Sequence, residues 1–227
     1  MTCYADEVIA LATPEAVRTV RFDPLLAPFS YHLTHPLQHD WHTPEVAHGL
    51  PEEGLLVIRP ICDATPDEGP ADWYGEPVLD WLSFSGQAST SPQIDRERVV
   101  KDCSVSIESL PPPSLLSRVK CLAAETQTPF LFYSCFMWGG EIEREYAWIF
   151  GRSEIALVGL PWNGTDERGA LAIMEPSAPV RVESGDVLVS ALEHLSLHLP
   201  TPFFAPHNRS FPWERYKLAA TPRPSRP

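Results

Sequence analysis

The strongest pattern of hydrophobic and polar positions lies in residues 129–151. Two runs rich in aromatic and aliphatic residues, PFLFYSCFMW and EIEREYAWIF, are separated by Gly139 and Gly140. Two glycines between strand-like runs are typical of a tight β-hairpin turn, because the turn needs positive φ angles that glycine adopts without steric cost. The pattern therefore predicts two central antiparallel strands, on which we expect the rest of the chain to pack.

One face of this predicted hairpin carries a row of charge. With Gly139 and Gly140 as the loop, Glu141, Glu143 and Glu145 share a face with the aromatic residues Phe136 and Trp138. Residues two apart on a strand lie roughly 6.5 to 7 Å from each other, so three like charges repel unless water or cations surround them. Two interpretations stay open, a hydrated outer face and a docking row for a basic partner or a metal. A longer loop with a bulge would shift the pairing.

Shorter patterns predict the remaining elements. Hydrophobic runs indicate strands at residues 4–12, 54–59, 77–85, 154–160, 170–175 and 179–183. Helical spacing of hydrophobic residues, with N-cap residues before it and prolines after it, predicts helices at residues 14–20, 115–126 and 187–199. Residues 21–53 carry repeated prolines and histidines, and we expect irregular structure there.

These elements together favour the α+β class. The expected fold is an antiparallel sheet centred on the Gly-Gly hairpin of residues 130–150, with helices packed on one face. Residues 1–218 are expected to form a single globular domain, with a subdivision conceivable at the prolines of residues 111–113. Residues 219–227 have no hydrophobic anchor and are expected to be a disordered tail.

The charge of the chain narrows the classes of partner. Seventeen Lys and Arg stand against thirty Asp and Glu, which gives a formal net charge of −13. Such a surface repels phosphate backbones and anionic membranes, so nucleic-acid and membrane binding are disfavoured and basic protein partners are favoured. No hydrophobic run reaches the roughly 20 residues of a spanning helix, and the first residues are acidic where a signal peptide is basic. We expect a cytoplasmic protein.

Histidines form the most suggestive metal-binding pattern. They recur at intervals of three, four and three residues, as His32, His35, His39 and His42. On a helix this spacing would place several imidazoles on one face, where they could hold a metal. Pro36 and Pro44 interrupt the segment, so an irregular loop with exposed histidines is the competing interpretation. A second pair, His194 and His198, lies in EHLSLH, which lacks the order of a metalloprotease helix.

Signatures of nucleophilic or nucleotide chemistry are absent from the sequence. There is no nucleophile elbow, no phosphate-binding glycine loop and no paired-cysteine motif, and Cys135 is expected to be a core residue. No cofactor is expected. The sequence therefore favours a non-enzymatic binding protein of the inhibitor or adaptor type, whose acidic surface engages a basic partner. The alternative is a metal-dependent hydrolase that uses the histidine-rich segment 32–48.

Overall fold

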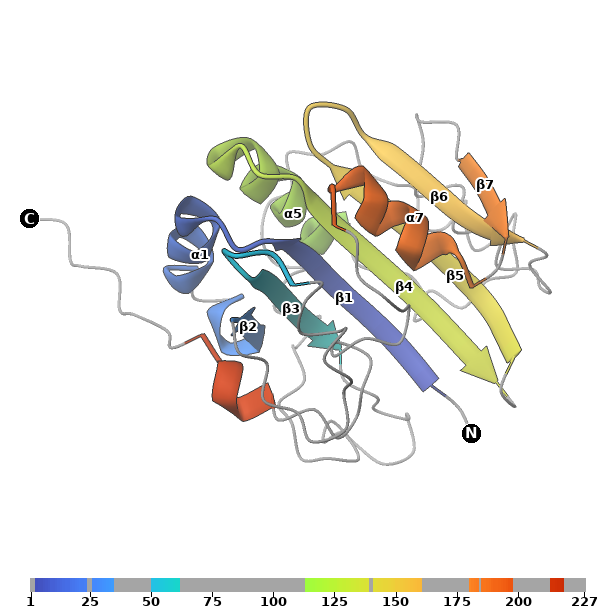
Figure 1. Ribbon diagram of the computed structural model, residues 1–227, viewed down its shortest axis with the longest axis horizontal. Helices are drawn as coiled ribbons and strands as arrows, with labels where there is room; N and C mark the ends of the chain where they lie inside the picture. The colour runs from blue at the N-terminus through green and yellow to red at the C-terminus, as the bar shows by residue number, and fades with distance from the viewer. Residues whose placement is uncertain are drawn as a thin grey trace, which may run out of the picture.

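A seven-stranded sheet forms the centre of the molecule in the computed structural model (Figure 1). The structure describes residues 3–23, 26–34, 50–61, 113–138, 141–160, 180–183, 185–197 and 213–218. The strands follow the spatial order β2-β3-β1-β4-β5-β6-β7. Their bounds are β1 Cys3–Leu11, β2 Ser30–Leu33, β3 Leu55–Ile61, β4 Phe130–Trp138, β5 Glu141–Phe150, β6 Ile155–Leu160 and β7 Val180–Glu183.

The sheet is mostly antiparallel, as predicted, and the α+β class is confirmed. Neighbouring strands from β2 to β6 pair antiparallel, and β7 pairs parallel with β6. Strands from both sides of residues 111–113 belong to the same sheet, because β1 pairs with β4 along most of its length. The hairpin strands β4 and β5 thus occupy the middle of the sheet.

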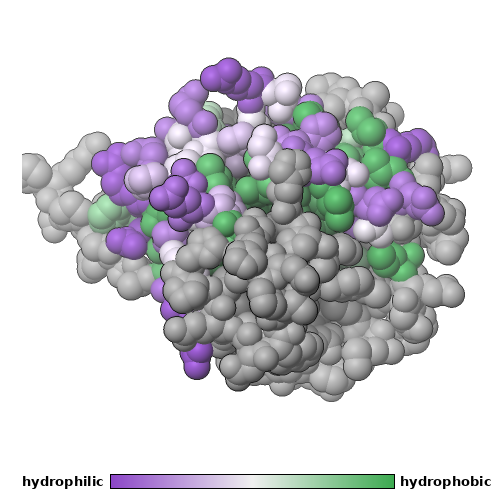
Figure 2. Space-filling model, in the orientation of Figure 1, coloured by the Kyte–Doolittle hydropathy of each residue, from purple (hydrophilic) through white to green (hydrophobic). Residues whose placement is uncertain are grey.

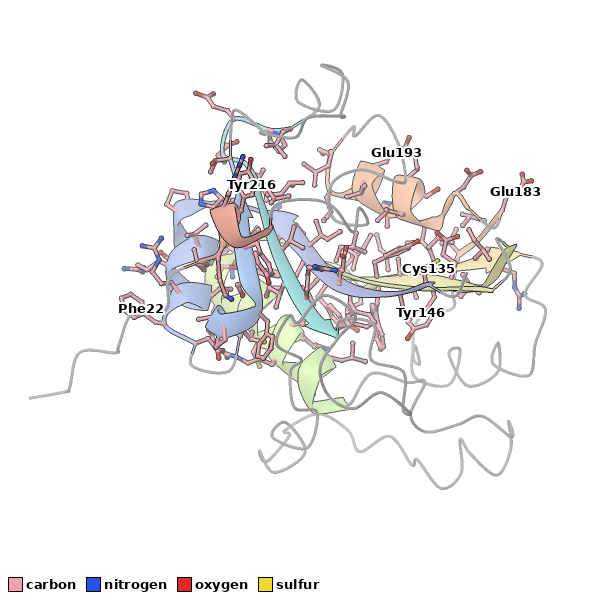
Figure 3. The ribbon with its side chains drawn as sticks, turned by 90° about the horizontal axis from the view of Figure 1, so that it is seen from below. Phe22, Cys135, Tyr146, Glu183, Glu193 and Tyr216 are labelled. Carbon is pink, nitrogen blue, oxygen red and sulfur yellow. The ribbon has the colours of Figure 1, made fainter. Side chains whose placement is uncertain are left out.

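Helices cover both faces of the sheet, so the prediction of helices on one face is wrong. The described helices are α1 (Pro14–Arg21), α5 (Pro113–Thr126) and α7 (Val187–His194), with 3-10 turns η1 (Ala27–Phe29) and η4 (Trp213–Tyr216). Alternate residues of β1, β3, β4, β5 and β6 belong to two separate hydrophobic clusters, one with α1 and α5 and the other with α7. Figure 3 shows Tyr146 on the α5 side of the sheet and Cys135 on the α7 side.

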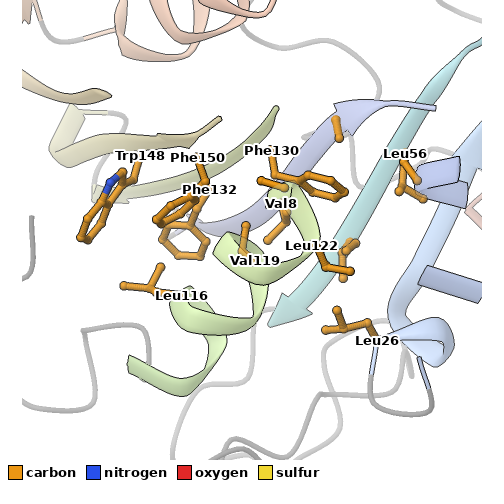
Figure 4. Packing of buried hydrophobic residues seen from close by; sticks show 14 of the residues in the cluster. Val8, Leu26, Leu56, Leu116, Val119, Leu122, Phe130, Phe132, Trp148 and Phe150 are labelled. Carbon is orange, nitrogen blue, oxygen red and sulfur yellow. The ribbon is translucent and has the colours of Figure 1, made fainter. Parts of the chain in front are cut away.

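The cluster on the α5 side is the more aromatic of the two. Leu116, Val119 and Leu122 of α5 pack beneath Phe130 and Phe132 of β4 (Figure 4). Trp148 and Phe150 of β5 extend this cluster, and their rings stack at a centroid distance of 5.1 Å. The predicted helix at residues 115–126 therefore packs on the hairpin as its hydrophobic spacing indicates.

Ion pairs attach α5 to its neighbours. Arg118 donates from Nε to the buried carboxylate of Asp23 at 2.7 Å, which ties α5 to the turn after α1. Lys120 pairs with Glu154, the residue that precedes β6. The polar side of α5 is thereby connected to the turn after α1 and to the residue before β6.

Most predicted elements occur close to their expected positions. β1, α1, β3, α5, β6 and β7 match within a few residues, whereas α7 ends at His194 and not at residue 199. β2 lies inside the segment that was expected to be irregular. Its outer edge is covered by the segment after η4, where the Leu218 N–H donates to the Ser30 carbonyl at 2.7 Å. The predicted strands at residues 77–85 and 170–175 and the predicted tail lie outside the described residues.

None of the described helices is both long enough and hydrophobic enough to cross a membrane. Hydrophilic side chains are spread over the described part of the face that carries α7 (Figure 2).

The N-terminus of α1 offers a test of local capping. The Thr13 hydroxyl accepts a hydrogen bond from the Ala16 N–H at 3.2 Å and lies 2.9 Å from the Thr128 hydroxyl. We expect Thr13→Ala to lower the free energy of unfolding by about 1 to 2 kcal/mol, as the loss of an N-cap does. Urea unfolding measures this free-energy difference from the change in midpoint, provided that the dependence of the free energy on urea concentration is the same in both proteins. Thr13→Ser keeps the hydroxyl and should cost about 0.5 kcal/mol or less; an equal loss in both variants would assign the effect to the methyl group.

Candidate functional site

Glu145 is a buried carboxylate at the junction between the sheet and α7. Its side chain comes from β5 and is 2% exposed. The Tyr133 hydroxyl donates to one carboxylate oxygen at 2.7 Å, and the Gly185 N–H donates to the other at 2.7 Å. Both oxygens therefore accept hydrogen bonds from elements other than β5, one from β4 and one from the turn before α7.

Local sequence makes this junction possible. Asp186 occupies the N-cap position of α7 but forms no side-chain cap hydrogen bond, and the carboxylate of Glu145 accepts from the Gly185 N–H immediately before it. Gly185 has a φ of 98°, which favours glycine. A Cβ at Gly159 would lie 3.2 Å from Val187 Cγ2 and 3.4 Å from Glu145 Cβ. Glycine at position 159 thus allows the close approach of α7 to β5.

Burial dominates the electrostatics of the junction. It raises the pKa of Glu145, while hydrogen bonds from Tyr133 and from the backbone of Gly185, Leu188 and Val187 act in the opposite direction. Burial also raises the pKa of Tyr133 well above its ordinary value, helped by the nearby Cys135 and Glu145. The tyrosine therefore stays protonated and serves as a hydrogen-bond donor.

Polar side chains continue from this junction across the sheet. Glu7 of β1 lies opposite Tyr133 in the register, and Arg59 of β3 pairs with Glu7 at 3.4 Å. Glu7 is also 2% exposed. Residues Arg59, Glu7, Tyr133 and Glu145 thus form a polar row over four adjacent strands on the α7 face.

Comparison with protein-family models, curated proteins and solved structures found no match for this chain.

The chemistry of the polar row must therefore be judged from its geometry alone. Buried carboxylates with a raised pKa are candidates for proton transfer. A general base, however, must come within roughly 2.6 to 3.2 Å of a substrate proton. Both oxygens of Glu145 are already hydrogen-bonded inside the protein, and the side chain is almost fully buried. The arrangement favours a structural role, the attachment of α7 to the sheet.

The predicted docking row is corrected at Glu145, which is buried and hydrogen-bonded and does not face water. The pair Trp138 and Glu141 occurs as predicted, but a register shift follows, and Phe136 pairs with Arg144 in place of Glu143. Glu145 therefore lies opposite Cys135 and shares the α7 face with it. Gly139, Gly140 and the side chains of Phe136, Trp138, Glu141 and Glu143 lie outside the described residues.

Of the four histidines in the pattern, only His32 lies among the described residues. His32 lies in β2, and its Nε2 is 2.9 Å from the carbonyl oxygen of Glu53. A strand at this position does not continue the helical spacing on which the metal hypothesis depends. His35, His39 and His42 lie outside the described residues. Among the residues that are described, no group of three or more His, Cys, Asp or Glu could hold a metal ion.

Several residues of interest were not predicted to belong to a buried polar group or to a hollow. Tyr133 and Glu7 were expected only as strand residues, and Gly185 only as part of a helix start. Arg152 and His194 line a hollow at the other end of the sheet. The hydrophobic run in β4 and the run YAWIF in the second half of β5 were the available signal, because strands buried on both faces lack clear alternation.

Proposed function

We propose that this chain is a non-enzymatic binding protein that engages a basic protein partner through one end of its sheet. We call this region the acidic end, and it consists of Glu183 of β7 and Asp186 before α7, next to the backbone positions of Glu141 and Glu143 at the start of β5. The observation that carries the proposal is the exposure of Glu183 and Asp186 beside the start of β5.

Strand direction brings these positions together. β6 runs antiparallel to β5, and β7 runs parallel to β6, so the last residues of β6 and β7 lie beside the first residues of β5. Glu183 pairs with Leu160 at the end of β6. A Cβ at Gly185 would lie 3.9 Å from the Ile142 side chain, which places the turn before α7 against the same part of β5.

The charge balance supports an interaction with a cationic surface. Within the described part of the chain, no ion pair or side-chain hydrogen bond engages Glu183 or Asp186. Figure 3 shows Glu183 at the periphery of the fold. The net charge of −13 adds long-range attraction for a basic protein.

The buried polar groups support the non-enzymatic part of the proposal. Glu145 and Tyr133 satisfy each other and the start of α7, and Glu7 is paired with Arg59. These groups connect the strands and the turn before α7, and so fix the position of the acidic end. A rigid sheet edge with exposed charge is suited to recognition, because little ordering is needed when a partner binds.

A charge-altered double variant tests the acidic end. Glu183→Lys with Asp186→Asn changes the net charge by +3 and keeps a good N-cap residue at position 186. The test uses a basic partner recovered from the cell in which the protein naturally occurs. We expect its association rate constant at low salt to fall by about tenfold or more, because electrostatic attraction between opposite charges speeds the diffusional encounter. Surface-based kinetics at two salt concentrations measure this.

The matched control is Glu52→Lys with Glu53→Gln, which makes the same charge change at exposed positions near the opposite end of the sheet. At high salt the control variant should bind with the same association rate as wild type. At low salt its association rate should fall only slightly. Equal losses in both double variants, with circular dichroism showing intact folds, would refute a specific acidic end. Recovery of no basic partner would refute the function itself.

A further inference from the structure

A hollow of about 600 Å³ is lined by residues from the C-terminal ends of α5 and α7 and from the connection between β5 and β6. Its lining includes Gln127, Pro129, Ile149, Arg152, Ile155 and His194. This volume is within the range of roughly 300 to 1,000 Å³ that small-molecule sites occupy. The hollow lies at the end of the hairpin where Phe130 pairs with Phe150, opposite to the acidic end. The inference drawn from it is independent of the proposed function.

Three side chains with hydrogen-bond donors line the hollow and have no partner among the described residues. They are the side chains of Arg152, Ser153 and His194. Over the ranges of the chain that the structure describes, no hydrogen bond or ion pair engages any of the three. The guanidinium of Arg152 offers a planar pair of donors, which matches the two oxygens of a carboxylate.

Negative charge is excluded from the lining of the hollow. None of its described lining residues is acidic, although the chain carries a net charge of −13. Two acidic residues that flank lining segments are engaged elsewhere, since Glu125 pairs with Arg118 at 3.1 Å and Glu154 pairs with Lys120, while Glu193, next to His194, is exposed and does not belong to the lining. The positive charge of Arg152 is thus left for a ligand from solution.

The helix ends beside the hollow do not need these donors. The Ala124 carbonyl of α5 accepts a hydrogen bond from the Gln127 side chain at 2.6 Å. The Leu192 carbonyl of α7 accepts hydrogen bonds from the backbone N–H groups of Leu195 and Leu197. These helix-end carbonyls accept hydrogen bonds from nearby residues and do not require Arg152 as a donor. Arg152 therefore remains the main charged group that is available to a ligand.

The lining also contains hydrophobic surface next to the donors. Ile149 and Ile155 contribute aliphatic side chains from β5 and β6. We propose that the hollow binds a small organic carboxylate. Arg152, with Ser153 and His194, holds the carboxylate group, and the hydrophobic body of the ligand packs on Ile149 and Ile155. Inorganic anions can contact the donors of Arg152, Ser153 and His194 but have no hydrophobic body to pack on Ile149 and Ile155.

Benzoate is the probe for this site, and benzamide is the matched compound without charge. The full chain is titrated with each compound, and with inorganic phosphate, while backbone amide resonances are followed by NMR. We expect benzoate to bind with a dissociation constant of about 1 mM or tighter and to shift the resonances of Gly151, Arg152 and Ser153. Benzamide and phosphate should each bind at least about tenfold more weakly.

Two arginine variants locate the binding. Arg152→Gln should weaken benzoate binding by about tenfold or more. Arg21→Gln removes the same charge from an exposed position on α1 and should change binding by about twofold or less, since distant surface charges are screened. Equal affinities in the two variants, shifts confined to other resonances, or equal binding of benzamide would overturn the proposal. Phosphate binding more tightly than benzoate would also overturn it.

Discussion

Gly54→Ala should destabilise the protein by about 3 to 5 kcal/mol, because two separate costs combine at this position. Gly54 has a φ of 81°, a conformation that a residue with a Cβ adopts only with strain. A Cβ would also lie 2.1 Å from the carbonyl oxygen of Leu33, which is backbone of the paired strand β2. Relief of this contact would require β2 and β3 to move apart.

Hydrogen bonds restrict such a movement. The Gly54 N–H donates to the Pro51 carbonyl at 2.9 Å, and the Ala12 N–H donates to the Gly54 carbonyl at 3.1 Å. The turn is thus attached to both β1 and its own preceding residues. Gly151→Ala is the matched control, because a Cβ there would meet Pro129 at 3.5 Å, an ordinary contact.

Denaturant unfolding of both variants measures the difference. Gly151→Ala should stay within about 0.5 kcal/mol of wild type, as surface substitutions usually do. Equal midpoints for the two variants would contradict the backbone conformation at Gly54.

Much of the fold could be predicted because its signals are local. Thr13 followed by Pro14 predicts the start of α1, and the hydroxyl of Thr13 indeed caps that helix. The hydrophobic spacing in residues 115–126 likewise predicts α5 and its buried side. These features depend on residues within one or two turns of each other, which a linear pattern contains.

The register of the hairpin depends on a feature with no local signal. The shift between Phe136 and Met137 adds a residue to β5 and exchanges the two faces of that strand beyond it. The run EIERE is polar at alternate and adjacent positions, so it fits either register. The placement of Glu145 on the α7 face was for this reason not predictable from the alternation of side chains.

The hollow was missed for a different reason. Its lining comes from residues 123–129, from residues 149–155 and from His194, which meet only after α5 and α7 have packed on opposite faces of the sheet. Because helices on one face were expected, no helix end was predicted beside the connection between β5 and β6. His194 was considered only as a member of the pair with His198 and not together with residues 149–155.

Glu145→Ala should lower the free energy of unfolding by about 3 to 5 kcal/mol, since it leaves buried donors unsatisfied on both sides of the lost carboxylate. The Tyr133 hydroxyl and the Gly185 N–H would each lose an acceptor at 2.7 Å. α7 would also lose the negative charge at its N-terminus. Hydrogen exchange should show the largest loss of protection in α7.

Glu145→Gln separates charge from shape. The amide oxygen can accept from the Gly185 N–H while the amide nitrogen donates to the Tyr133 hydroxyl, so the contacts of the wild type are largely kept. We expect this variant to lose about 1 kcal/mol or less at neutral pH. A loss as large as that of Glu145→Ala would show that the carboxylate charge, and not its hydrogen-bonding shape, holds α7.

The pH dependence of these stabilities follows from the raised pKa of Glu145, whose first cause is burial. The folded state then holds the proton of this carboxyl more tightly than the unfolded state does. Its contribution to stability is present below the unfolded pKa and is lost as the pH rises through the folded pKa. The stability of wild type relative to Glu145→Gln should therefore fall as the pH is raised above about 4.3, the ordinary pKa of a glutamate, and then become constant. Urea unfolding of both proteins from acidic to neutral pH measures this difference, in which the other carboxylates cancel. A difference that grows with pH would mean that the hydrogen bonds from Tyr133 and Gly185 outweigh burial and lower the pKa of Glu145 in the folded state.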